Sequence, residues 1–188
     1  VVTLDSRMIR RQLLAGLAVA SGAMHPLGAF AADEAFAAGA GRLLAGLRAA
    51  LSHVKPSAAA LVPPMSARAL APVPATLPVV SQLDTLVAQS PAASRDFMRS
   101  LRSLSPHLRW RQSYRAPQVS DHFLQNYGWI ELIGAQGLWH DPTVSIGVLL
   151  LGPDTHYPEH YHPAVERYIP LSGEAEWFDQ DHGWRRVP

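Results

Sequence analysis

The last quarter of the chain is a succession of short strand patterns separated by turns. Residues 143–151 (TVSIGVLLL) form an apolar, β-branched run, and the GPDT stretch that follows has the composition of a turn. Further strand patterns occupy residues 156–162, 165–171, 174–179 and 184–187. Short strands with turns at such regular intervals favour an antiparallel β-barrel or jelly roll.

A histidine motif lies within these strand patterns. His160, His162 and Glu166 stand as H-x-H-x3-E. Residues two apart on a strand point to the same side, so the two imidazoles share a face. A Pro-Ala pair then suits a turn or bulge, after which Glu166 and Tyr168 again lie two apart. Imidazoles and carboxylates are ligands for divalent metals, so the spacing predicts a metal site built on two paired strands.

Residues 1–31 have the pattern of a leader. Three arginines precede an apolar run, and Ala29-Phe30-Ala31 is a small-x-small cleavage signal, so the sequence predicts a signal peptide. Arg10-Arg11 loosely resembles a twin-arginine signal, with Ile9 where Ser or Thr usually stands. The apolar run is too short and too rich in Ala and Gly for a stable membrane span. We therefore expect a periplasmic or secreted protein, with a cytoplasmic protein as the alternative.

Helical patterns fill the region between the leader and the strands. Residues 32–78 combine an amphipathic helix over 33–54 with a Pro/Ala-rich connector that has no core of its own. Residues 79–142 form a second, mainly helical part, whose first helix pattern starts at Leu77. The expected elements are helices over 77–90, 91–104 (with Ser90 as N-cap) and 121–134, and a strand over 107–114.

Composition excludes several classes of function. The chain has no cysteine, so neither a disulfide nor a thiolate metal site is possible. It carries 16 basic and 15 acidic residues, for a net charge of +1. This balance gives no electrostatic footprint for nucleic acid.

The stretch GPDTHYPEHYHPAVERYIPLSGEAEW resembles the first conserved motif of the cupin superfamily. It is more narrowly similar to the cupin-type dimethylsulfoniopropionate (DMSP) lyases, through Tyr157 three residues before His160 and Tyr168 two residues after Glu166. Upstream, LRWRQSY and NYGWIELIG also match, so the likeness covers residues 79–188. It implies a mainly β cupin barrel preceded by an α-helical region, and a carbon–sulfur lyase that converts DMSP to dimethyl sulfide and acrylate.

The resemblance also implies roles for individual residues. His160, His162, Glu166 and Tyr168 match metal ligands, Tyr168 also matches the catalytic base, and Tyr157 matches a second active-site tyrosine. The cofactor would be a divalent transition metal (Zn, Fe, Mn or Ni) that acts as a Lewis acid on the carboxylate of a small zwitterionic sulfonium substrate.

Two features depart from the family pattern. Asp154 stands where the general motif has a glycine, which predicts a different turn. Cupins supply a further histidine from a later P-x-G-x-x-H motif, and this sequence reaches Pro188 without one; His182 lies in a polar turn. Residues 143–188 are therefore expected to form the first half of a barrel that is truncated at its C-terminal end, with an open edge prone to pairing.

The motif residues are compatible with other functions. A different metal-dependent cupin enzyme, such as a dioxygenase or an isomerase, would use the same histidines and glutamate with another substrate. A non-catalytic binding cupin, or a truncated remnant, would use none of this chemistry. Trp177 or Trp184 would either hold a sulfonium by a cation–π contact or fill the core.

Overall fold

The computed structural model describes residues 2–5, 27–64, 66–158, 166–179, 181 and 183–187. The helices are α1 (Leu27–Val54), α2 (Pro56–Ala59), α3 (Leu83–Gln89), α4 (Ala92–Leu104) and α5 (Asp121–Asn126), with short 3₁₀ helices η1 (Pro78–Gln82) and η2 (Ser105–His107). The strands are β1 (Val2–Asp5), β2 (Tyr127–Gly134), β3 (Trp139–His140), β4 (Ser145–Leu151), β5 (Glu166–Ile169), β6 (Ala175–Asp179) and β7 (Gly183–Val187).

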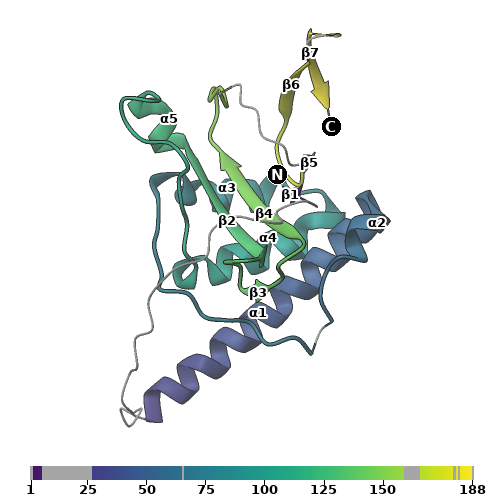
Figure 1. Cartoon of the computed structure of the whole chain (residues 1–188), viewed down its shortest axis with the longest axis vertical. Coiled ribbons are helices and arrows are strands. Elements are labelled where there is room, and N and C mark those ends of the chain that lie inside the picture. Colours follow the sequence, from purple (N-terminus) through teal and green to yellow (C-terminus); the bar gives the residue numbers. More distant parts are fainter. Residues whose placement is uncertain are drawn as a thin grey trace.

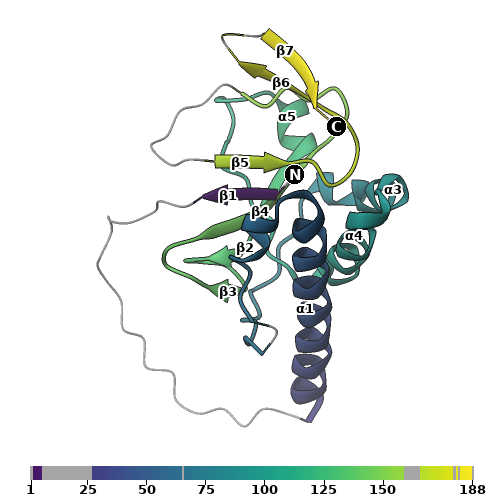
Figure 2. The same ribbon diagram turned by 90° about the vertical axis from the view of Figure 1, so that its right-hand side faces the viewer.

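Five of these strands form one sheet in the order β3-β2-β4-β1-β5. The β2–β4, β4–β1 and β1–β5 pairs are antiparallel, and β2–β3 is parallel. Strands β6 and β7 form a separate antiparallel hairpin. Figures 1 and 2 show β1 between β4 and β5, with the hairpin above them. A helical region followed by strands is confirmed, and the described strands form an open sheet rather than a closed barrel.

The two faces of the sheet carry different clusters of apolar side chains. Figure 2 shows α1, α3 and α4 on one side of the strands. Ile130 and Val148 belong to the main core together with Leu47 of α1 and Leu101 of α4. A smaller cluster lies apart from this core and includes Tyr127 of β2 and Leu149 of β4, each an odd number of residues from Ile130 and Val148 on the same strand. Since side chains alternate along a strand, the second cluster lies on the opposite face of the sheet.

Helices α1 and α4 pack closely at Gly46. A Cβ atom at Gly46 would lie 2.8 Å from the Cα and 2.9 Å from the backbone nitrogen of Phe97. Phe97 is fully buried, so its backbone has little room to move. At Gly41, on the same helix, nothing lies within 4 Å of the corresponding Cβ position.

We expect Gly46→Ala to lower the free energy of unfolding by about 1–3 kcal/mol, the usual cost of an overpacked core. Gly41→Ala is the matched control and should raise it by up to about 1 kcal/mol, because alanine is the better helix former. Urea unfolding followed by circular dichroism measures both. Equal stability of the two variants would show that α1 and α4 do not touch at Gly46.

The structure corrects the helix predicted over residues 121–134. Helix α5 ends at Asn126, and Tyr127–Gly134 is the strand β2, which pairs with β4. Both faces of β2 are covered, so its sequence is apolar almost throughout and lacks the alternation of a half-exposed strand. A short apolar run of this kind cannot be told from a helix by periodicity alone.

A further prediction of local structure is wrong. Residues 107–114 do not form a strand; Arg109 and Arg111 make single bridges to Ala75 and Trp129. The Pro/Ala-rich connector packs on the main core, in which Ala58 and Val62 are buried. Proline limits hydrogen bonding along a chain but does not prevent the residues around it from packing.

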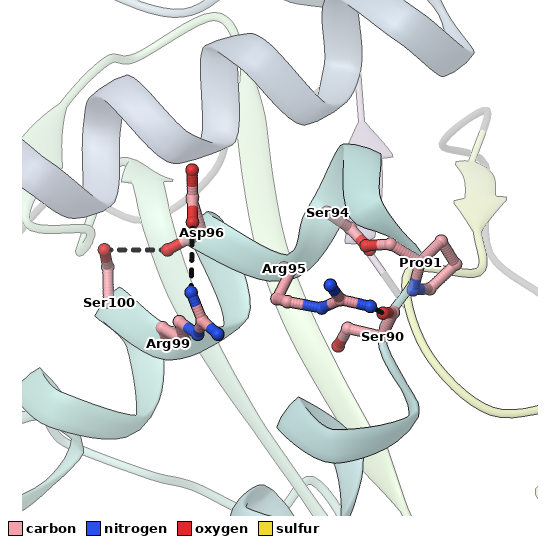
Figure 3. Close-up of polar contacts among 7 residues, drawn as sticks. All are labelled: Ser90, Pro91, Ser94, Arg95, Asp96, Arg99 and Ser100. Carbon is pink, nitrogen blue, oxygen red and sulfur yellow. Dashed lines mark hydrogen bonds and ion pairs between the residues drawn. The ribbon is translucent and has the colours of Figure 1, made fainter.

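The start of α4 also differs from expectation. Pro91 directly precedes the helix, and its carbonyl accepts hydrogen bonds from the amides of Ser94 and Arg95. Ser90 does not cap it: its Oγ donates to the carbonyl of Leu86 (2.6 Å), and its own carbonyl accepts from Nη2 of Arg95 (3.0 Å; Figure 3). A serine side chain that bonds back to the preceding helix is no longer available as a cap.

The predicted leader overlaps described elements at both of its ends. Val2–Asp5 is β1, and α1 begins at Leu27. Residues 6–26, with the arginines and most of the apolar run, lie outside the described residues. The signal peptide stays a prediction. Among the described helices, none has the length and apolarity to cross a membrane.

Candidate functional site

Strand β5 carries two of the predicted site residues, Glu166 and Tyr168. The strand leads into Leu171, which is buried in the main core. Ser94 of α4 donates from Oγ to the Leu171 carbonyl (2.6 Å), and Ser172 donates from Oγ to the Leu86 carbonyl of α3 (2.6 Å). The helices therefore anchor the end of β5, while pairing with β1 fixes its side.

Glu166 and Tyr168 are joined directly. The phenol of Tyr168 donates a hydrogen bond to Oε2 of Glu166 at 2.6 Å, and both side chains are half-buried. The Tyr168 ring also lies against Trp177 of β6, with ring centroids 5.0 Å apart. The alternation predicted from the sequence thus places a carboxylate and a phenol side by side.

The surroundings of Tyr168 keep its phenol protonated. Burial raises the pKa of Tyr168 well above its ordinary value, and the hydrogen bond to Glu166 and the charge of that carboxylate raise it further. In the absence of a compensating positive charge, Tyr168 is a hydrogen-bond donor rather than a base.

Tyr157 follows β4 and lies in a group of four rings, which we call the aromatic cluster: Tyr114, Phe123, Tyr127 and Tyr157. Phe123 and Tyr127 are stacked with centroids 4.7 Å apart, and Tyr157 lies 5.5 Å from Tyr127 and 6.1 Å from Phe123. Tyr114 meets Tyr157 edge-on at 6.0 Å. The cluster covers the sheet face opposite α1, α3 and α4.

The pKa values of the two predicted site tyrosines, Tyr157 and Tyr168, are both raised by their surroundings. Burial raises the pKa of Tyr157 strongly, and the charges of Tyr127, Tyr114 and Tyr168, with a hydrogen bond to Tyr127, raise it further. The pKa of Tyr168 is likewise raised in part by Tyr127 and Tyr114. Through β1, Glu166 and Tyr168 are in register with Ser145 and Gly147 of β4, which share a side of that strand with Leu151, the partner of Tyr127, so the pair and the aromatic cluster lie on the same face of the sheet.

The two histidines of the motif, His160 and His162, lie outside the described residues, and so does His182. Among the residues that are described, no three His, Asp or Glu side chains are placed to hold a metal ion. The predicted metal site thus stays a prediction. The strand expected over 156–162 is wrong for residues 156–158, which are irregular.

Sequence reasoning missed Tyr114 and Tyr127 as neighbours of the site. The pattern of residues 121–134 predicts a helix there, and a helix has no register against β4. No alternation of polar and apolar residues marks β2 as a strand, because both of its faces are covered. Of the two tryptophans considered for a sulfonium, Trp177 lies beside Tyr168, whereas Trp184 is 55% exposed and contacts Phe178 and His156.

Known proteins resemble this chain in sequence and in structure. A stretch of 78 residues is 32% identical to the dimethylsulfoniopropionate lyase DddQ of Ruegeria pomeroyi and covers 42% of this chain. The matched part spans about two fifths (39%) of the length of that curated relative.

Two solved structures share the fold. The crystal structure of the DMSP lyase DddQ from Ruegeria pomeroyi matches with a TM-score of 0.64 and 27% identity, over 80% of this chain and 76% of that one. A chain from the crystal structures of the DMSP lyases RdDddP and RnDddQII matches with a TM-score of 0.54 and 27% identity, over 63% and 60%.

The sequence pattern of the dimethylsulfoniopropionate lyases matches residues 34–188, which include α3, α4, the aromatic cluster and the Glu166–Tyr168 pair. The match leaves out only the predicted leader and the first residues of α1. This chain belongs to the dimethylsulfoniopropionate lyase family.

Proposed function

We propose that this chain carries the metal- and base-bearing part of a cupin-type lyase that cleaves DMSP into dimethyl sulfide and acrylate by β-elimination. The observation that carries the proposal is the 2.6 Å contact between Tyr168 and Glu166, the residues to which the sequence resemblance assigns the roles of base and metal ligand. A phenol and a carboxylate held together on one strand form half of the donor set that the motif predicts.

A divalent metal fits these residues. Glu166 and Tyr168 present two oxygen donors from the same face of β5, and His160 and His162 would add two nitrogen donors. This mixed set suits Zn, Fe, Mn or Ni. When bound, the metal would supply a positive charge that lowers the pKa of Tyr168 and a Lewis acid for the negative charge that develops on the substrate carboxylate.

The reaction assigned to Tyr168 is proton abstraction. Its phenolate oxygen takes the proton from the carbon next to the substrate carboxylate. The electrons of that C–H bond form the C=C bond of acrylate, and the C–S pair leaves with sulfur as neutral dimethyl sulfide. The leaving group needs no acid, since the sulfonium loses its charge as it departs. The proton on Tyr168 is then released to water.

Trp177 is the residue proposed to face the sulfonium. It is half-buried and its ring borders Tyr168, so a cation held against its ring would lie near the base. We also propose a small zwitterionic substrate, no nucleic-acid partner, a periplasmic or secreted location, and a barrel of the cupin type. The charge balance supports the absence of a nucleic-acid partner, and the leader pattern supports the location.

The test is product release by the purified chain. We expect the chain loaded with Fe, Zn, Mn or Ni to release dimethyl sulfide and acrylate from DMSP in equal amounts, at a rate at least 100-fold above the chelator-treated chain. Headspace gas chromatography and liquid chromatography measure the two products. Oxygen consumption in place of dimethyl sulfide would favour a dioxygenase, and absence of both with all four metals would overturn the proposal.

A further inference from the structure

Tyr127 is the most deeply buried tyrosine of the aromatic cluster. It is 1% exposed, and its ring stacks on Phe123 at 4.7 Å. A buried phenol needs a hydrogen-bond partner. Its Oη donates to Oγ of Ser113 at 3.3 Å, and its ring lies against that of Tyr157, with centroids 5.5 Å apart. Tyr127 thus links Tyr157 to the strand β2.

The partners of Tyr127 are themselves held in place. The side-chain amide of Gln112 donates to the carbonyls of Leu124 (2.6 Å) and Tyr127 (2.9 Å). These bonds tie the segment that carries Ser113 to the end of α5 and the start of β2. The hydroxyl of Tyr127 therefore has a fixed acceptor, and the ring that it anchors lies beside the ring of Tyr157.

The geometry of the aromatic cluster argues against a ligand site within it. Its ring centroids are 4.7–6.1 Å apart, which is ordinary contact between aromatic side chains. A cation bound between two faces needs a ring centroid within about 6 Å on each side, so the rings would have to stand much farther apart. The cluster is a packed support beside the Glu166–Tyr168 pair.

We infer that Tyr127 is a positioning residue for Tyr157: its stacked ring, anchored through its hydroxyl to Ser113, fixes where the Tyr157 ring lies. The inference rests on the proposed function in that Tyr157 serves the lyase reaction. Its structural part, the ring contact between the two tyrosines and the anchor on Ser113, stands without that reaction. Misplacing an active-site group by about 1 Å lowers the rate by as much as 100-fold, so an effect on turnover follows.

The test replaces Tyr127 with Phe, which keeps the ring and removes the hydroxyl. In the full chain labelled with 3-fluorotyrosine, with Tyr157→Phe to assign the signal, we expect the Tyr157 ¹⁹F resonance to shift and broaden in Tyr127→Phe. In the metal-loaded chain, we expect kcat for DMSP to fall about 10-fold while KM stays within about twofold. A purely structural loss would lower the amount of active protein and leave the Tyr157 signal unchanged.

Tyr114→Phe removes a hydroxyl from the same cluster and should move the Tyr157 resonance less, because the Tyr114 ring lies farther from Tyr157 (6.0 Å between centroids) than the Tyr127 ring does (5.5 Å). If Tyr127→Phe does not fold, Ser113→Ala removes the acceptor of the Tyr127 hydroxyl and should move the resonance in its place. An unchanged Tyr157 resonance in the folded variant overturns the inference. A wild-type chain without lyase activity but with the resonance shift overturns the proposed function and leaves the positioning role standing.

Discussion

Replacing Tyr168 with Phe is expected to lower kcat for DMSP cleavage by about 10²–10⁴-fold, the usual contribution of a general base. Phe keeps the ring and its contact with Trp177, whose ring centroid lies 5.0 Å from that of Tyr168. It removes only the oxygen that would accept the substrate proton. The measurement is dimethyl sulfide release by the metal-loaded chain, compared with the matching Tyr-to-Phe variant of DddQ from Ruegeria pomeroyi.

The control for this experiment is Phe178→Leu. Phe178 neighbours Trp177 on β6 but is 55% exposed, and its ring contacts Trp184. Its replacement changes an aromatic side chain on the same strand without touching the Glu166–Tyr168 pair, so activity should stay within about twofold of wild type. If Tyr168→Phe also stays within twofold of wild type, the base is another residue.

The second large effect is expected from the histidines. His160→Ala together with His162→Ala leaves Glu166 and Tyr168 as the remaining ligands of the proposed site. Loss of residues that only orient a ligand already costs 10–100-fold in metal affinity, and loss of two ligands should cost more. We expect the metal content after dialysis to fall from about one equivalent to near zero, together with lyase activity.

Metal content is measured by inductively coupled plasma mass spectrometry, and the melting temperature is measured with and without added metal. A ligand that binds only the folded state raises that temperature, so the increase seen for wild type should vanish in the double variant. His107→Ala is the matched control, since His107 is an exposed histidine of η2. A double variant that retains its metal would show that the ion is bound elsewhere.

The strands near the C-terminus could be predicted because turns punctuate them. Strand β4 and the hairpin of β6 and β7 begin and end within two residues of the expected limits, and Gly173 has the positive φ (71°) of a turn glycine. Strand β2 could not, because both of its faces are covered. Tyr127 and Trp129 pack in the smaller apolar cluster while Ile130 packs in the main core, so the strand has apolar residues on both faces and no regular alternation with polar ones.

The candidate site was predictable only where it depends on spacing along one strand. Glu166 and Tyr168 lie two residues apart on β5, and their contact follows from the alternation of side chains. The contact between Tyr127 and Tyr157 depends on where α5 ends and on how β2 pairs with β4. Such relations between distant segments are set by tertiary packing, which a single sequence does not display.

Strand β1 has a consequence for folding. Val2 pairs with Val148 of β4 and with Ile169 of β5, so the middle of the sheet forms only when segments far apart in the sequence meet. Until then, the edges of β4 and β5 that face β1 expose unpaired amides and carbonyls. The same residues belong to the predicted leader, so processing of the N-terminus and completion of the sheet would compete for one segment of chain.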